Sequence, residues 1–454
     1  MDALHETGGA PPADALHRTG VTIREAGPDD AVAGVAPRWV ALPENTGEVA
    51  ALMRVSAEHD LAVTPVGGGT RLHWGPPPER CDLLIDTCCL NQVLEHASGD
   101  LVVRVQAGLT MDSLAETLAA EGQELSLDVP LDGATVGGVL ATAIAGPRRF
   151  RHGTARDLLI GITVVLADGT TAKSGGKVVK NVAGYDLGKL FTGSYGTLGV
   201  ITEAAFRLHP IPGDRRWIIA ELPAPGTPST EAVQDVQAVQ DVQDVQDVQG
   251  DGRPDAPERP GSPPGLDVLA AELAASQAEP SAIEVDWPDS RGGPVVAVLV
   301  EGTAADARAR AVRDLMAGHG TARITAGPPG WWGTLPGEDV LLEVRVPPSR
   351  AGGALRAVMA RGLPAHVRGS LATAALQVAL PPDVGGSAFA EFVSRVRDDL
   401  GRLGGGLTVL TAPQELAGRV DRWGPVGALP LLRRVKERFD PGRRMSPGRS
   451  VGGI

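Results

Sequence analysis

The pattern of apolar and polar positions divides the first half of the chain into short helices and strands. Apolar residues recur at helical spacing over 43–60, with Asn45 or Thr46 as the N-cap, and over 110–122 behind Thr110. Strand-like apolar runs lie at 61–66, 81–87, 101–107, 158–170 and 200–208. Asp168-Gly169 predicts a hairpin turn inside the fourth run. The alternation of these elements predicts an α+β domain.

The second half repeats this mixed pattern after an interruption. Residues 223–265 contain tandem DVQ triplets followed by a run rich in Pro, Gly, Asp and Arg. A period of three matches neither a helix face nor a strand, and one Val per triplet cannot form a core, so we expect a disordered insertion. Helical spacing returns over 265–277, 305–320 and 389–405, and strand-like runs lie at 295–302, 341–348 and 407–413.

These patterns predict five regions along the chain. A flexible N-terminal arm precedes the first α+β domain, and a second, smaller α+β domain follows the insertion. A short helix and a Pro/Gly-rich tail end the chain. The expected boundaries are 1–36 for the arm, 37–212 for the first domain, 223–265 for the insertion, 266–426 for the second domain and 427–454 for the tail.

Composition narrows the class of protein. The formal net charge of −13 argues against a general nucleic-acid binder, which would present a basic face. The first residues carry neither a basic start nor an apolar run, so no signal peptide is expected. No stretch of ~20 apolar residues predicts a membrane span. We therefore expect a cytoplasmic protein without a membrane span of its own.

Lysine and tyrosine are concentrated in one window. Of five lysines, Lys173, Lys177, Lys180 and Lys189 lie within residues 173–199, beside both tyrosines and seven glycines. Elsewhere the chain uses arginine almost exclusively, and a compact ammonium is not equivalent to a planar guanidinium at a tight site. This concentration indicates a functional segment, although a solvated lysine-rich loop gives the same composition.

Three glycine-rich segments each adjoin a predicted strand. They are PVGGGTR at 65–71, DGATVGGVLATAIAG at 132–146 and GSYGTLGVITE at 193–203. Glycines let backbone N–H groups approach an anion, so a diphosphate is the expected guest. A P-loop needs Lys-Ser or Lys-Thr after its glycines, and no G-x-G-x-x-G follows a strand. The segments instead suit an extended dinucleotide held mainly by main chain.

The order of these motifs resembles a known flavoprotein family. PVGGGTR, ATVGGVLAT, HGTARDLLIGITVVLADG and GSYGTLGVITE are similar, over about residues 37–212, to the FAD-binding domain of the vanillyl-alcohol-oxidase/PCMH superfamily. KVVKNVAGYDLGKLFTGSYGTLGV more closely resembles the E-type FAD-binding subunit of bacterial glycolate oxidase. Relatives outside that subunit type usually have an acid where this chain has Tyr195. The ending FDPGRRMSPGR resembles the family's FDP…NPGR, with Ser446 replacing Asn.

The resemblance implies a PCMH-type, two-subdomain FAD-binding domain, then a smaller α+β cap domain and a tail that returns to the FAD domain. Some relatives tether the flavin through a His just after the glycine triplet, where this chain has Thr70, so non-covalent FAD is expected. The implied cofactor-binding residues are Pro65, Val66, Gly67, Gly68, Gly69, Thr70, Arg71, Thr135, Gly137, Gly138, Thr142, Gly146, Gly153, Gly196, Gly199, Val200 and Ile201.

The resemblance also implies partners. A glycolate-oxidase-type complex joins this subunit to a D-type flavoprotein and an iron–sulfur subunit, oxidises a small 2-hydroxy acid, and can bring the chain to the inner face of the membrane. One alternative is a self-sufficient FAD-dependent dehydrogenase of a 2-hydroxy acid or alcohol. Another is a non-catalytic scaffold that keeps the fold.

The sequence indicates catalytic residues less clearly than cofactor-binding residues. D-type relatives carry an HxH pair that can bind a metal, whereas the nine histidines here form neither HxH nor HExxH, so no metal site is expected. His152 and His366 are candidate bases, although a lone His is more often structural. The arginines that could clamp a carboxylate, or form ordinary ion pairs instead, are Arg148, Arg149, Arg151 and Arg368.

The block KVVKNVAGYD leaves alternatives open. Lys177, Lys180, Asn181 or Tyr185 could lie beside the flavin, where a cation or a phenol would stabilise negative charge on the reduced ring. The same block could form a docking surface for partner subunits. A loop pinned by its glycines, without either role, is the third interpretation.

Overall fold

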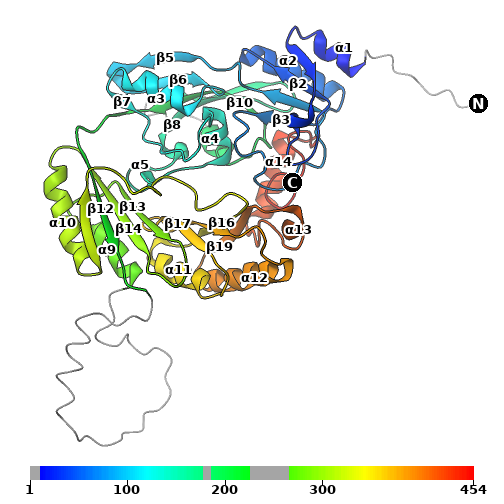
Figure 1. Cartoon of the computed structure of the whole chain (residues 1–454). Helices are drawn as coiled ribbons and strands as arrows, with labels where there is room; N and C mark the ends of the chain where they lie inside the picture. The colour runs from blue at the N-terminus through cyan, green and yellow to red at the C-terminus, as the bar shows by residue number, and fades with distance from the viewer. Residues whose placement is uncertain (1–10, 177–185, 225–264) are drawn as a thin grey trace, which may run out of the picture.

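The computed structural model describes residues 11–176, 186–224 and 265–454 and consists of two α+β domains (Figure 1). Among the described residues, the N-terminal domain contains a four-stranded, a five-stranded and a two-stranded sheet, and it lies above the cap domain in this view. The cap domain is built on one eight-stranded sheet. The predicted α+β class is therefore confirmed. Most of the predicted insertion lies outside the described residues, as do Lys177, Lys180, Asn181 and Tyr185.

The first sheet of the N-terminal domain has the strand order β1-β2-β4-β3, with β1 antiparallel to β2 and the other pairs parallel. Asn45 caps the helix beside it by accepting a hydrogen bond from the Glu48 N–H, as predicted. The elements are α1 (Pro12–His17), β1 (Thr22–Glu25), η1 (Pro28–Asp30), β2 (Trp39–Leu42), α2 (Thr46–Glu58), β3 (Val63–Val66) and β4 (Leu83–Asp86).

The structure at the start of the chain differs from the flexible arm predicted from the sequence. β1 pairs with β2 in register from Thr22 opposite Leu42 to Glu25 opposite Trp39. Leu16 of α1 is fully buried against the same core as α2. The arm predicted for residues 1–36 is therefore wrong for 12–25, because one buried leucine and one edge strand suffice to fix a short segment.

The second sheet is antiparallel, with the order β5-β6-β10-β8-β9. The predicted hairpin joins β8 and β9, and Gly169 takes the left-handed φ of 83° in its turn. Thr110 caps its helix as predicted. The elements are β5 (Val93–Ala97), η2 (Ser98–Asp100), β6 (Val102–Gln106), α3 (Met111–Ala119), β7 (Gln123–Glu124), α4 (Val136–Thr142), α5 (Arg149–His152), α6 (Ala155–Leu158), β8 (Leu159–Val165), β9 (Thr171–Gly175), α7 (Leu187–Phe191), β10 (Val200–Arg207) and β11 (His209–Pro210).

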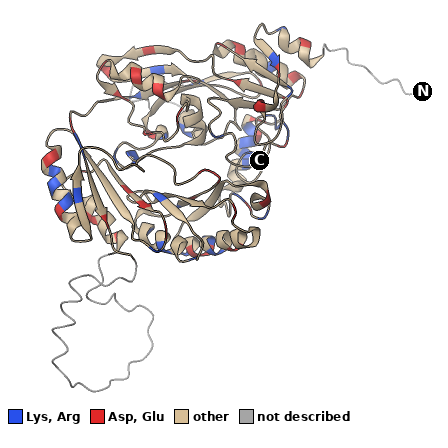
Figure 2. Cartoon of the chain, viewed as in Figure 1, with Lys and Arg blue, Asp and Glu red and all other residues tan. Residues whose placement is uncertain are grey.

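The cap sheet has the order β15-β12-β14-β13-β17-β18-β16-β19. Because β12 belongs to it, this sheet begins before the predicted insertion rather than after it. Acidic and basic residues are interspersed along α10 (Figure 2). The elements are β12 (Arg215–Glu221), α9 (Leu266–Ala275), β13 (Ala282–Trp287), β14 (Val295–Glu301), α10 (Ala305–Ala317), β15 (Thr321–Thr325), β16 (Val340–Arg345), η3 (Pro348–Arg350), α11 (Ala351–Met359), β17 (His366–Ser370), β18 (Ala375–Leu380), α12 (Gly386–Arg402) and β19 (Gly406–Thr411).

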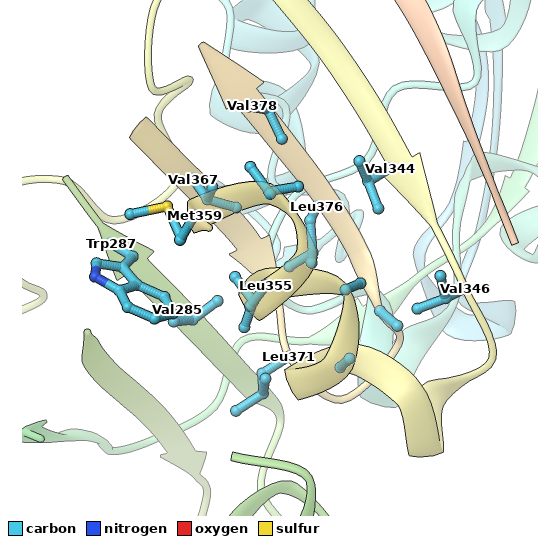
Figure 3. Packing of buried hydrophobic residues seen from close by; sticks show 14 of the residues in the cluster. Val285, Trp287, Val344, Val346, Leu355, Met359, Val367, Leu371, Leu376 and Val378 are labelled. Atoms are coloured by element: carbon cyan, nitrogen blue, oxygen red, sulfur yellow. The ribbon is translucent and has the colours of Figure 1, made fainter. Parts of the chain in front are cut away.

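The cap helices cover one face of this sheet and bury its apolar residues. Figure 3 shows Leu355 and Met359 of α11 packed among Val285, Val367 and other strand residues. Neighbouring residues in a strand point to opposite faces. The residues between these valines therefore point to the other face, towards the N-terminal domain.

The C-terminal segment leaves the cap and returns to the N-terminal domain. It contains α13 (Gln414–Ala417) and α14 (Leu429–Phe439). Met445 bridges to Val63 of β3, and the Ser446 N–H donates to the Val63 carbonyl at 2.9 Å. The buried Lys436 ammonium donates to the carbonyls of Thr197 and Met445, both at 2.8 Å, and pairs with Asp440. The chain end thus completes the first domain.

Candidate functional site

The glycine triplet after β3 is shaped by contacts with the second glycine-rich segment. A Cβ added at Gly67 would overlap the Thr135 hydroxyl, and one at Gly68 would overlap the Gly133 carbonyl. Gly69 has a left-handed φ of 67°. The triplet therefore lets two backbone segments meet at close range, which places both at the edge of one cavity.

The second segment forms α4 behind a threonine cap. The Thr135 hydroxyl accepts a hydrogen bond from the Gly138 N–H at 3.2 Å, and the Thr142 hydroxyl donates to the Gly138 carbonyl at 2.8 Å. A Cβ at Gly137 would lie 3.0 Å from the Ala107 Cβ, so the helix lies close to the second sheet. Helix capping and dense packing thus account for part of this small-residue pattern.

These segments line a cavity with an empty volume of about 890 Å³. The structure brings together all the predicted cofactor residues except Gly146, Gly153 and Val200. The lining is Thr64, Pro65, Val66, Gly67, Gly68, Gly69, Thr70, Arg71, Leu72, Thr87, Ala107, Leu131, Ala134, Thr135, Gly137, Gly138, Val139, Ala141, Thr142, Ile144, Tyr195, Gly196, Gly199, Ile201 and Arg449.

The three predicted residues outside this lining have other contacts. Gly146 packs against the Asp128 backbone, and Gly153, with a φ of 80°, packs against the Asp157 side chain. Val200 is fully buried in the core beneath the first sheet. Gly146 lines a smaller neighbouring cavity instead, and Gly153 is half-buried.

Unsatisfied polar atoms at the cavity wall fit an anionic cofactor. Thr64 Oγ1, Arg71 Nε and Arg449 Nη1 are buried, and none has a hydrogen-bond partner in the described chain. Burial lowers the pKa of Arg449 to about 10, so it stays cationic at neutral pH. Its Nη2 donates to the carbonyls of Leu72 and Trp74. Two cationic side chains with unused donors match the charge of a diphosphate.

Tyr195 is held beside this cavity in an unusual conformation. Its φ of 54° is left-handed, and its ring meets Trp423 edge-on at 6.0 Å between centroids. Burial raises the pKa of the Tyr195 phenol, so the hydroxyl stays protonated at neutral pH. The family's usual acid is thus replaced by a neutral hydrogen-bond donor. The sequence marked Tyr195 as a departure, whereas the role of Arg449 in the cavity was missed.

The cap sheet presents a row of polar residues towards the N-terminal domain. Asp286 of β13 lies opposite Arg368 of β17, Arg368 opposite Gln377 of β18, and Gln377 opposite Glu343 of β16. These positions alternate with the core valines and leucines. Four adjacent strands therefore carry polar or ionisable groups on one face. Only Arg368 in this row was predicted, with His366 two residues before it.

His366 and Arg368 share one carboxylate. His366 Nε2 lies 2.7 Å from Asp286 Oδ1, and Arg368 Nε donates to the same oxygen at 2.7 Å. Burial raises the pKa of Asp286, but the hydrogen bonds from His366 and Arg368 outweigh it, so the pKa lies below that of a free aspartate. Arg368 also donates to the Thr334 hydroxyl and Leu335 carbonyl, so its guanidinium is largely engaged.

A second, smaller cavity lies between the two domains. Its empty volume is about 330 Å³, and Arg149, Glu284, Trp331 and Arg368 are among its walls. It adjoins the larger cavity, because Ile144 lines one and Ala145 lines the other. The remaining lining is Pro130, Gly146, Pro147, Gly333, Thr334, Gly369 and Gln377.

His152 and two predicted arginines lie elsewhere. His152 Nε2 is 3.9 Å from Glu301, and Arg148 pairs with Glu124, Asp128 and Glu301. Arg151 contacts Glu279 near the surface. None of the three lines either cavity. His152 and Arg148 thus belong to an ion-pair network between the domains.

The described residues contain neither a cluster of metal ligands nor a membrane-spanning helix. Within them, no group of three or more His, Cys, Asp or Glu side chains is placed to hold a metal ion. No helix within residues 11–176, 186–224 and 265–454 is long and apolar enough to cross a bilayer.

Comparison with known proteins defines the class of the first domain. Residues 37–175 match the family model described as FAD binding domain. The chain therefore carries a PCMH-type FAD-binding domain, which confirms both the predicted cofactor and the family resemblance. One relative is "Glycolate oxidase subunit GlcD" of Bacillus subtilis, 36% identical over 185 residues, which are 40% of this chain and 39% of the relative.

Other relatives share the same region. "D-lactate dehydrogenase" of Archaeoglobus fulgidus is 36% identical over 181 residues, 39% of this chain and 41% of that protein. "D-2-hydroxyglutarate dehydrogenase, mitochondrial" of Bos taurus is 38% identical over 171 residues, 37% and 31% of the two chains. This chain thus matches about two fifths or less of each relative's length.

Solved structures extend the similarity of fold to both domains. A carbohydrate oxidase from Microdochium nivale has a TM-score of 0.65 at 16% identity, covering 96% of this chain and 98% of that one. p-Cresol methylhydroxylase has a TM-score of 0.63 at 15% identity, covering 96% and 92%. The similarity of fold therefore covers both the FAD-binding domain and the cap.

Acid precipitation is expected to release all the flavin from this chain. The residues lining the larger cavity include no His or Cys, and Thr70 stands where some relatives have the tethering His. The supernatant should carry the yellow absorbance and the pellet none. Flavin fluorescence that stays with the denatured chain on an electrophoresis gel would contradict non-covalent binding.

Proposed function

We propose that this chain is an FAD-dependent oxidoreductase acting in the oxidation of a small 2-hydroxy acid, with glycolate converted to glyoxylate. We further propose that it is the E-type subunit of a glycolate-oxidase-type complex with a D-type flavoprotein and an iron–sulfur partner. The observation that carries the oxidoreductase proposal is the contact between the two cavities: the glycine-lined one adjoins one with ionisable walls. The GlcD match and the E-type resemblance of residues 177–200 support the complex.

The chemistry needs a proton acceptor and an electron acceptor. Oxidising an alcohol carbon to a carbonyl removes a hydride from carbon and a proton from oxygen. Bound FAD would supply the acceptor for the two electrons, which then pass to the iron–sulfur partner. Within this chain, His366 is the proposed proton acceptor, because Asp286 orients its ring and Arg368, two residues further along the same strand, lines the smaller cavity. Arg71 and Arg449 would hold the diphosphate.

Two alternative functions are compatible with the same fold. A self-sufficient dehydrogenase is favoured by the polar face of the cap sheet, which supplies base, acid and cation within one chain. A non-catalytic scaffold would retain the fold without bound flavin.

Anaerobic mixing with glycolate or D-lactate should separate these alternatives. We expect the visible flavin absorbance of the isolated chain to bleach slowly, and that of the complex reconstituted with its partner subunits to bleach rapidly. Rapid bleaching of the isolated chain would instead identify a self-sufficient enzyme. A purified chain without visible flavin bands would support the scaffold.

A further inference from the structure

Arg149 is a cation without a counterion in the smaller cavity. Its Nε donates to the Gly146 carbonyl at 3.0 Å and its Nη2 to the Ala145 carbonyl, while Nη1 makes no hydrogen bond within the described residues. No carboxylate of the described chain lies within ion-pair distance of it. Burial lowers the pKa of Arg149, which shows how poorly this environment solvates its charge. A partly buried charge of this kind is costly unless an anion joins it.

Glu284 faces the same cavity as an uncharged acid. Its side chain is 6% exposed, and Oε1 has no hydrogen-bond partner among the described residues. Burial raises the pKa of Glu284 to about 8, and the Asp128 charge adds to this rise while Arg149 opposes it. Ser370 lies opposite Glu284 on the next strand, and its hydroxyl opposes the rise in the pKa of Glu284. At neutral pH the cavity therefore contains one free cation and one neutral carboxyl donor.

We infer that the cavity between Arg149 and Glu284 is a binding site for the carboxylate group of a small acid. The ligand carboxylate would pair with the free Nη1 of Arg149. It would also accept a hydrogen bond from the protonated Glu284 carboxyl group. The Gln377 amide and the Trp331 indole, both in the wall, would contact the remaining atoms. This inference rests on the proposed function only in the choice of a 2-hydroxy acid among such carboxylates.

Arg149 and Glu284 do not form an ion pair with each other, and the neighbouring charged groups have partners of their own. Arg368 is already bonded to Asp286, Thr334 and Leu335, so it is not the free cation of this cavity. Asp128 is bonded to Arg148. Glu284 cannot neutralise Arg149 at pH 7 while its own proton is retained. The charge of Arg149 is thus available to a ligand.

Calorimetry with oxalate on the FAD-loaded protein tests the site without any turnover. Oxalate should bind the wild type, while the neutral analogue glycolamide should not. Arg149→Gln should weaken oxalate binding by about tenfold to a hundredfold at unchanged FAD content, because it removes a charge-assisted hydrogen bond. Arg149→Lys keeps the charge and should lose less. Arg151→Gln, on the same short helix but paired with Glu279, is the matched control and should bind as the wild type.

The pH dependence of oxalate affinity is a second test of the site. A purely structural role of Glu284 would not produce such a dependence. Above pH 8 the ionised Glu284 repels a carboxylate, so wild-type affinity for oxalate should fall about tenfold between pH 7 and pH 9. Glu284→Gln should bind about as tightly as the wild type at pH 7 and lose no affinity over that range. Arg149 and Asp128 are the charged groups whose fields act on Glu284, and Arg368 lies in the wall of the same cavity.

The outcomes separate this inference from the proposed function. Oxalate binding that depends on Arg149 supports the site even if glycolate never reduces the flavin. Equal oxalate affinity in wild type and Arg149→Gln, equal binding of glycolamide, or no oxalate binding at millimolar concentration would each overturn it, even if glycolate oxidation were demonstrated.

Discussion

Replacing Lys436 by methionine is expected to lower the free energy of unfolding by about 3–5 kcal/mol. The Lys436 ammonium is buried, pairs with the fully buried Asp440, and donates to the carbonyls of Thr197 and Met445. Methionine fills a similar volume but leaves the Asp440 charge unpaired and two carbonyls without their donor. Urea-induced unfolding followed by circular dichroism measures the change.

Arg438→Met is the control for this substitution. Arg438 lies on the same helix and is exposed, so its loss should change stability by less than about 0.5 kcal/mol. A Lys436→Met variant as stable as Arg438→Met would show that the buried pair is not needed to hold the C-terminal segment on the FAD domain.

Replacing Gly68 by valine is expected to weaken FAD retention by about tenfold to a hundredfold. A side chain at Gly68 overlaps the Gly133 carbonyl, which is backbone and cannot rotate away. The glycine triplet must then move away from the second segment and from the cavity it lines. The FAD content after gel filtration and the dissociation constant for added FAD measure the effect.

Gly99→Ala is the matched control in the same domain, because a Cβ there meets nothing within 4 Å. It should retain FAD as the wild type does. Thermal unfolding of both apoproteins separates a local displacement from loss of the fold. Full FAD occupancy in Gly68→Val would contradict the close contact between the two segments.

The FAD half of the site could be predicted from sequence because its signals are local. Glycines after a strand, a threonine cap and an Asp-Gly turn each fix a conformation within a few residues. The order of these motifs then indicated the family. Arg449 was missed because it reaches the cavity from a part of the chain 377 residues beyond Leu72.

The cap half could not be predicted in the same way. Asp286 and Arg368 meet only because β13 and β17 are neighbours in the sheet, although 82 residues separate them. A signal was present in AIEVDW, where acids alternate with apolar residues inside a fully buried strand. Such acids must face a polar surface or a ligand, since burial of an unpaired charge is costly. Pairing of the strands decides which groups they meet.

The return of the C-terminal segment to β3 makes cofactor binding depend on parts of the chain that lie far apart in sequence. The glycine triplet follows β3, whereas Arg449, one of two cationic side chains in the cavity wall, belongs to the C-terminal segment. A fragment that contains every glycine motif but stops before Lys436 lacks both that charge and the Lys436 anchor. The FAD content of a preparation should therefore report whether the C-terminal segment is docked on the FAD domain.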